Sequence, residues 1–328
     1  INSEEAELND LAGRGNAAVA FPEMRRANVG LCVATLLAGC MKPAAPIGAW
    51  NSPAQAWAMT QGQLAWYQAM EDDNQLRQIL TGQQLRDHMQ AWEEDSDACP
   101  IGYILSLEGA DSLRTLDDLE SNYAMGLRAL GPAHYGKGRY ALGHDEDGPL
   151  SQLGRELLAE MDRLNLILDA THLCEKTFWK ALDAFNGPVW ASHHNCRALV
   201  DDPRQLSDQQ IKTLADRNAV IGVACDVWMV VPNWQRRQTT HEDRDDANLN
   251  ALANHIDHIC QLLGDTKHVG IGTDLDGGFG NEQTPSDLKS IADLPKLWDI
   301  LRSRGYNELD LENIAHKNFI DFLLREWA

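Results

Sequence analysis

The stretch VGIGTDLDGG, residues 269–278, runs from a short apolar strand directly into two aspartates and two glycines. Tight turns favour Asp and Gly, so a turn alone would explain this stretch if it stood by itself. Six other short apolar runs have the character of β-strands, and several also end in residues that carry chemistry. Together with the run at 267–276, they occupy residues 29–38, 102–110, 125–133, 164–172, 187–194 and 219–227.

Amphipathic stretches with helical spacing fill the gaps, at residues 150–164, 207–217 and 247–264. The second opens with Ser207 and has Gln210 three residues on, which is a capping-box pattern, and the third ends on Gly264, a helix-ending signal. Near-continuous apolar strands separated by helices predict a parallel sheet buried on both faces. For 328 residues we therefore expect an α/β fold, a (β/α)8 TIM-type barrel that forms one domain over residues 1–328.

Composition narrows the class of partner. A net charge of −21 argues against nucleic acid, because phosphate binding needs a basic face. No apolar run is long enough to span a membrane, so no membrane segment is expected. The seven cysteines are an odd number without paired spacing, which indicates reduced, mostly buried thiols and a cytoplasmic protein. The question of a homo-oligomer stays open.

Residues that could carry chemistry follow the predicted strands at their carboxyl ends, where barrels of this class place their active sites. They are Glu108, His134, His172, His193 followed by His194, Arg204 and Asp274. Each has a structural alternative: the glutamate could cap a helix, a lone histidine could be a packed core residue, and the aspartate could form a turn. Their shared position favours a metal site, because imidazole and carboxylate groups are ligands of Zn²⁺. A carboxylate can bridge two such ions about 3.5–4 Å apart, and the ions lower the pKa of a bound water, which Asp274 could hold or deprotonate.

Six segments resemble motifs of the membrane (renal) dipeptidase family. They occur in the family's order and cover roughly residues 20–325, and the chain resembles a bacterial-type member. They are LEGADSL (107–113), LGPAHYG (130–136), LILDATHLCEKTFW (166–179), GPVWASHHNCRAL (187–199), DDPRQLSDQQI (201–211) and VGIGTDLDG (269–277). The family consists of metal-dependent dipeptidases with a (β/α)8 barrel. The resemblance therefore implies a zinc-dependent hydrolase with a binuclear site.

The same resemblance implies a role for each candidate residue. Glu108 would bridge the two metals, while His172 and His193 would complete the coordination of one of them. A metal-bridging hydroxide would attack the scissile carbonyl, with Asp274 managing the protons and His134 stabilising the oxyanion. Arg204 would pair with the free carboxylate of a dipeptide, and His194 stands where the family often has serine.

One family motif has no counterpart. The family's first strand ends in His-x-Asp, which supplies two ligands of the first metal, whereas the nearest string here is LND at 8–10, with Leu8 in the histidine's place. We expect this sequence to begin after that strand, so that two zinc ions per chain would require an upstream His-x-Asp. The alternative is a degenerate first metal site, in which case Asp10 is the first residue to consider.

The function predicted from these residues is hydrolysis of short peptides, mainly dipeptides, including those with a C-terminal D-residue. One alternative is another amidohydrolase-class metal hydrolase that acts on a lactone or a small amide, for which Arg204 would have no anionic partner. A second alternative is a non-catalytic binding protein with a degenerate metal site. Metal content distinguishes the second alternative from an enzyme.

Overall fold

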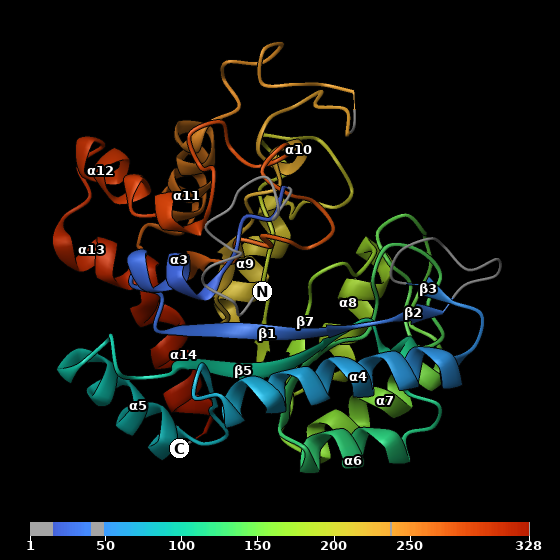
Figure 1. The fold of residues 1–328 in the computed structure, drawn as a ribbon. Helices are drawn as coiled ribbons and strands as arrows, with labels where there is room; N and C mark the ends of the chain where they lie inside the picture. The colour runs from blue at the N-terminus through green and yellow to red at the C-terminus, as the bar shows by residue number, and fades with distance from the viewer. Residues whose placement is uncertain (1–15, 41–48, 237, 328) are drawn as a thin grey trace. The chain divides into compact units, whose positions relative to one another are not determined.

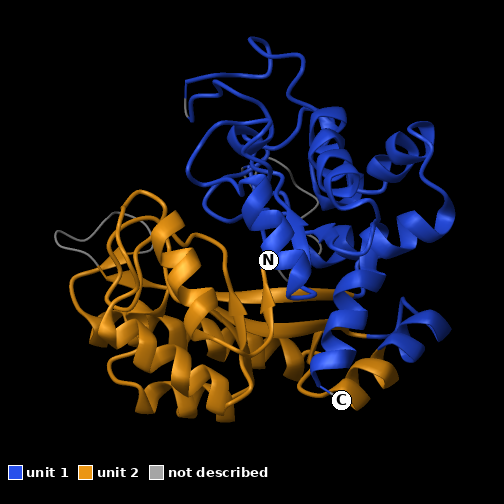
Figure 2. Cartoon of the chain, turned by 180° about the vertical axis from the view of Figure 1, so that it is seen from behind, with its two compact units in different colours: residues 1–30, 89–99, 191–328 blue, residues 31–88, 100–190 orange. Residues whose placement is uncertain are grey.

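The computed structural model describes residues 16–40, 49–236 and 238–327 (Figure 1). The chain divides into two compact units, each assembled from separate stretches of sequence (Figure 2). The unit we call the sheet unit comprises residues 31–88 and 100–190, and the C-terminal unit comprises residues 1–30, 89–99 and 191–328. The single domain expected over residues 1–328 stays a prediction.

A parallel sheet with the strand order β1-β5-β6-β7-β8 organises the sheet unit. Its longest strand, β5, is buried along its whole length except at its last residue, Glu108, because both faces are covered. A further strand, β4, pairs in parallel with the first half of β5, and β2 and β3 form a separate short pair. The strands are β1 (Leu31–Leu37), β2 (Gly39–Cys40), β3 (Ala49–Trp50), β4 (Leu76–Gln78), β5 (Ile101–Glu108), β6 (Leu127–Gly131), β7 (Ile167–Asp169) and β8 (Val189–Trp190).

Helices connect these strands, as expected for parallel pairing. They are α4 (Pro53–Asp72), α6 (Asp117–Ala124), α7 (Gln152–Arg163), α8 (Glu175–Ala184) and the short 3-10 turn Ala110–Ser112. The helix α5 (Gly82–Glu94) has residues in both units. In Figure 1, α4 runs alongside β1 and β5.

The outer edge of β1 is covered by side chains of α4. The amide of Gln63 accepts a hydrogen bond from the Leu37 backbone N–H and donates one to the Leu37 carbonyl, both at 2.8 Å. The Tyr67 hydroxyl donates to the Thr35 carbonyl at 3.1 Å. Backbone groups that a neighbouring strand would otherwise satisfy are thus paired with a helix, which is one way to protect a sheet edge.

The C-terminal unit contains two further strands, β9 (Ile221–Val223) and β10 (Val269–Ile271), which pair with each other in parallel. Ala191 adds an isolated parallel bridge to Ile221. The helical segments of this unit are α3 (Phe21–Arg26), α9 (Asp208–Asp216), α10 (Val227–Val230), α11 (Leu249–Leu263), the 3-10 turn Ile291–Asp293, α12 (Lys296–Ser303), α13 (Glu308–Glu312), the π-helical turn Asn313–Lys317 and α14 (Asn318–Glu326).

The predicted elements agree closely with these. Each of the seven apolar runs contains a parallel strand, and the three predicted helices are α7, α9 and α11. The capping box of Ser207 and Gln210 is present, and Gly264 ends α11 with a left-handed φ of 80°. The α/β class is confirmed.

The strand pairing among the described residues does not close into an eight-stranded barrel. Within those residues β1 pairs with β5 on one edge, and no described strand pairs with its other edge. Leu8 and Asp10, named above in connection with the first metal site, lie outside the described residues.

The cysteines behave largely as predicted. Cys174, Cys196, Cys225 and Cys260 are buried thiols, and Cys32 is half-buried. Burial raises the pKa of the Cys260 thiol to about 11, so it stays protonated and unreactive at neutral pH.

Candidate metal site

Glu108 and His172 form the centre of the candidate site in the sheet unit. Glu108 is the last residue of β5, and its Oε1 lies 2.9 Å from Nε2 of His172, which follows β7. The His172 ring is buried, and its backbone adopts a left-handed φ of 68°. That conformation is uncommon outside glycine and is concentrated at functional sites. A carboxylate oxygen and an imidazole nitrogen that converge in this way are a donor pair suited to Zn²⁺.

His134 lies beside this pair. It follows β6, and its Nε2 is 3.9 Å from Glu108 Oε1, which is too long for a direct hydrogen bond. The His134 and His172 rings have centroids 4.5 Å apart. About a third of the His134 side chain is exposed, so it can reach a bound ligand.

Two aromatic residues that the sequence analysis missed complete this cluster. His144 is buried in the loop between β6 and α7, and its Nδ1 lies 3.4 Å from Nδ1 of His172. The Tyr135 ring contacts both histidines, with centroid distances of 4.6 Å to His144 and 5.2 Å to His172. Tyr135 directly follows His134 at a predicted strand end, so its position could have indicated it, whereas His144 lies in a loop and its position gave no such signal.

The other predicted residues lie in the C-terminal unit. His193 comes three residues after the end of β8, and the Ser192 hydroxyl lies 2.8 Å from its Nδ1. Arg204 is only 1% exposed, and its guanidinium donates a hydrogen bond from Nη2 to the His193 carbonyl at 3.0 Å. His194 is buried and donates its backbone N–H to the Gly222 carbonyl at 2.7 Å.

Two glycines allow the Ser192 backbone to lie this close to β9 and β10. A Cβ on Gly222 would meet the Ser192 carbonyl oxygen at 2.1 Å, and one on Gly272 would meet the same oxygen at 1.8 Å. No side chain fits at either position without moving the segment that carries His193. Gly222 and Gly272 are therefore needed for this close packing.

The two aspartates of the opening stretch have different surroundings. Asp274 follows β10 at a left-handed φ of 57°, in a turn closed by a hydrogen bond from the Gly277 N–H to its carbonyl. Asp276 instead accepts hydrogen bonds from the backbone N–H groups of Ala18 and Val19, at 2.7 and 3.0 Å. Asp276 thus ties an early segment of the chain to the turn after β10, whereas Asp274 begins that turn, and its catalytic role stays a prediction.

A buried carboxylate after β9 was also missed. Asp226 is fully buried and accepts hydrogen bonds from Arg236 at 2.6 Å, Trp228 at 2.8 Å and Gln283 at 2.8 Å. Burial raises the pKa of Asp226, and the facing Arg236 opposes that shift. These paired groups stabilise the loop after β9, and a sequence does not reveal which arginine will face a given carboxylate.

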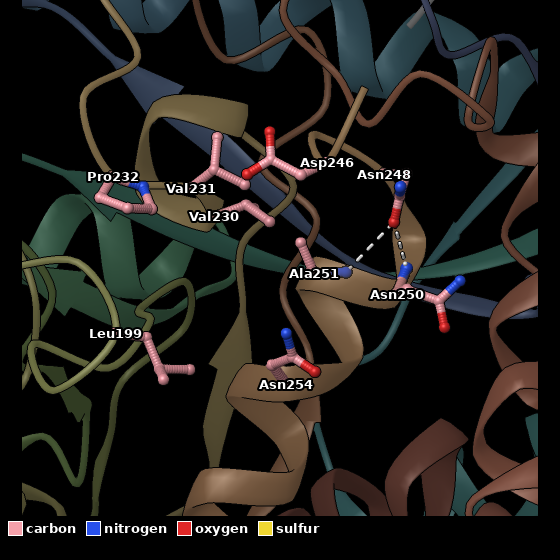
Figure 3. A pocket seen from close by; sticks show the side chains of 9 residues that line it. All are labelled: Leu199, Val230, Val231, Pro232, Asp246, Asn248, Asn250, Ala251 and Asn254. Carbon is pink, nitrogen blue, oxygen red and sulfur yellow. Dashed lines mark hydrogen bonds between the residues drawn. The ribbon is translucent and has the colours of Figure 1, made fainter. Parts of the chain in front are cut away.

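One pocket of the C-terminal unit lies at the start of α11 and contains none of the predicted residues (Figure 3). Its polar residue Asn248 caps the helix by accepting hydrogen bonds from the N–H groups of Asn250 and Ala251. Another lining residue, Asp246, is held by Arg244. These groups perform structural tasks, so we assign no chemistry to this pocket.

The six predicted residues therefore form two sets. Glu108, His134 and His172 gather in the sheet unit, while His193, Arg204 and Asp274 belong to the C-terminal unit. A family described as Membrane dipeptidase (Peptidase family M19) matches residues 2–325. The chain belongs to the membrane dipeptidase family. The predicted family is confirmed, and so, at the level of the family, is the prediction of a metallodipeptidase hydrolase.

Relatives agree with this assignment. An uncharacterized protein encoded in the pqqA 5′ region of Klebsiella pneumoniae is 30% identical, over 71% of this chain and 84% of its own length. A dipeptidase of Claviceps purpurea, tcpJ, is 27% identical over 72% of this chain, which spans 55% of that relative's length. A metallopeptidase of Rhodobacter sphaeroides, solved with a phosphinate mimic of L-Ala-D-Ala, shares the fold with a TM-score of 0.78 at 24% identity, covering 98% of this chain and 94% of that one.

No described helix of this membrane dipeptidase family member is both long and apolar enough to cross a bilayer. Metal use follows from the family and fits the Glu108–His172 pair.

Proposed function

We propose that this protein is a zinc-dependent dipeptidase that hydrolyses dipeptides, including those with a C-terminal D-residue. The observation that carries the proposal is the Glu108–His172 pair, in which a strand-end carboxylate and a buried imidazole meet at 2.9 Å. The substrate class is supported by the Rhodobacter sphaeroides relative, whose bound molecule mimics L-Ala-D-Ala. The buried thiols support a cytoplasmic location.

Glu108, His172 and His193 are the residues we propose as zinc ligands. Glu108 would bridge the ions if two are bound, because one carboxylate can serve two such ions. Two zinc ions would also require the ligands of an upstream His-x-Asp. His193 would ligate through Nε2, because its Nδ1 faces the Ser192 hydroxyl. Zinc bound there would polarise the scissile carbonyl and lower the pKa of the attacking water.

The remaining residues would handle charge and protons. Asp274 would accept the proton of the attacking water and deliver it to the leaving amine. His134, partly exposed beside Glu108, would donate a hydrogen bond to the oxyanion that develops on the former carbonyl oxygen. Arg204 would pair with the substrate's free carboxylate, and its burial would make that pair strong because little water competes.

Hydrolysis of L-Ala-L-Ala and L-Ala-D-Ala before and after chelation tests this function. We expect a chelator to abolish hydrolysis of both dipeptides and zinc to restore it. Full hydrolysis in excess chelator would refute the metal-dependent reaction. A zinc-loaded protein that cleaves neither dipeptide but opens lactones would favour the alternative amidohydrolase.

A matched pair of carboxylate variants tests the ligand assignment. Glu108→Gln should lose most of the bound zinc, as measured by elemental analysis of the purified protein. Asp118→Asn is the control, because Asp118 is a buried carboxylate of the same unit whose partner is the Arg114 guanidinium at 2.7 Å. Equal zinc content in the two variants would remove Glu108 from the metal site.

A further inference from the structure

The buried ring of His144 has a specific geometry toward His172 that none of the roles above uses. The two Nδ1 atoms lie 3.4 Å apart, and the ring centroids are 5.3 Å apart with a 32° angle between the ring planes. His172 turns its other nitrogen, Nε2, toward Glu108. His144 therefore contacts the side of the His172 ring that faces away from the carboxylate.

The backbone holds the two histidines in this register. Gly143 forms an antiparallel bridge with Leu173, and the Cys174 N–H donates to the Leu142 carbonyl at 3.0 Å. The segment before His144 is also folded back on itself, with the Gly143 N–H bonded to the Gly136 carbonyl at 2.9 Å. The two residues before His144 are thus tied to the two residues that follow His172.

The chemistry of an imidazole ligand fixes where its proton must be. If Nε2 of His172 binds a cation, the single ring proton resides on Nδ1 and needs an acceptor. Nδ1 of His144 is placed to accept it, which puts the proton of His144 on Nε2, the atom 3.7 Å from Asp145 Oδ1. Outer-shell partners of this kind orient a ligand histidine and select its tautomer.

We propose that His144 is a positioning residue: it accepts the Nδ1–H of His172 and so holds that ring in the tautomer whose Nε2 is available to the metal. This inference rests on the proposed role of His172 as a ligand. His144 itself is not a ligand in this arrangement, because its Nδ1 points at His172 and its Nε2 points toward Asp145.

Zinc affinity measured by competition with a chromophoric chelator tests the proposal. His144→Phe keeps a ring but has no acceptor, and we expect zinc affinity to fall about 10- to 100-fold. His144→Gln keeps an acceptor oxygen and should retain most of the affinity. His88→Phe is the control, because His88 is a buried histidine of the same unit that packs against β5 at Gly102; it should lower stability without lowering zinc affinity.

A spectroscopic measurement on the unaltered protein gives a second readout. Long-range ¹H–¹⁵N spectra show which ring nitrogen carries hydrogen, and in the zinc-loaded protein we expect Nδ1–H on His172 and Nε2–H on His144. A proton on Nδ1 of His144 would overturn the proposal, even if His144→Phe fails to fold. Unchanged zinc affinity in His144→Phe, or equal losses in the Phe and Gln variants, would also overturn it while leaving the ligand assignment intact. A wild-type protein that binds no zinc would instead refute the proposed function, and this inference with it.

Discussion

Replacing Gly272 by alanine should disable the site without touching any proposed ligand. The new Cβ would lie 1.8 Å from the Ser192 carbonyl oxygen, where real contacts are never shorter than 3.0 Å, so the two backbones must separate by more than 1 Å. Ser192 precedes His193 and bonds to its Nδ1, so that movement reaches the ligand directly. A misplacement of about 1 Å can cost roughly 100-fold in rate, and overpacking of this kind costs about 1–3 kcal/mol of stability.

Dipeptide hydrolysis and thermal unfolding of Gly272→Ala check this expectation. We expect kcat/KM to fall by about two orders of magnitude in protein that is still folded. Gly62→Ala is the control, because Gly62 lies within α4 and a Cβ there would meet nothing within 4 Å. That variant should keep full activity and gain about 0.5–1 kcal/mol of stability. Wild-type activity in Gly272→Ala would refute the reasoning that close backbone packing positions His193.

Three further perturbations follow from the structure. Arg204→Ala should raise KM for free dipeptides far more than for C-terminally amidated ones, because the free dipeptides lose about 2–5 kcal/mol of binding free energy. Equal effects on both substrates would remove Arg204 from carboxylate binding. Asp274→Asn should lower kcat by about 100- to 10,000-fold while zinc content, measured in parallel, stays unchanged. Burial lowers the pKa of His255 from 6.5 to about 4. Between these pH values the unfolded chain binds a proton that the folded protein does not, so the free energy of unfolding decreases as pH falls from 6.5 to 4. Urea unfolding should show a loss of about 3 kcal/mol over that interval that is absent in His255→Gln.

The strands and their ends were predictable because the signals are local. A parallel strand buried on both faces has a near-continuous apolar sequence, and β5 shows this plainly. Glu108 and His172 lie together because β5 and β7 both pair with β6, so their carboxyl ends share one edge of the sheet. The rule that carboxyl ends of neighbouring parallel strands lie at one edge was enough to predict that Glu108 and His172 would lie close together, without any knowledge of the loops.

The loop residues were not predictable in this way. His144 reaches His172 only because Gly143 bridges to Leu173, a pairing that depends on how the chain folds back and has no periodic signature. Asp276 looked equivalent to Asp274 in the sequence, yet its carboxylate is occupied by the N–H groups of two residues more than 250 positions away. Turn chemistry explained why both aspartates occur there but could not assign them different tasks.

The amide of Gln63 determines how easily another strand can pair with the edge of β1. Because it bonds to both backbone groups of Leu37, it occupies the place that one peptide unit of an adjoining strand would take. Strand addition at Leu37 is therefore an exchange reaction, in which two existing hydrogen bonds are given up for each pair that is formed. The net gain in hydrogen bonding is close to zero, so a strand can add there only if its side chains contribute favourable packing of their own. Another copy of the sheet, approaching by its backbone alone, gains little by displacing a side chain already in place.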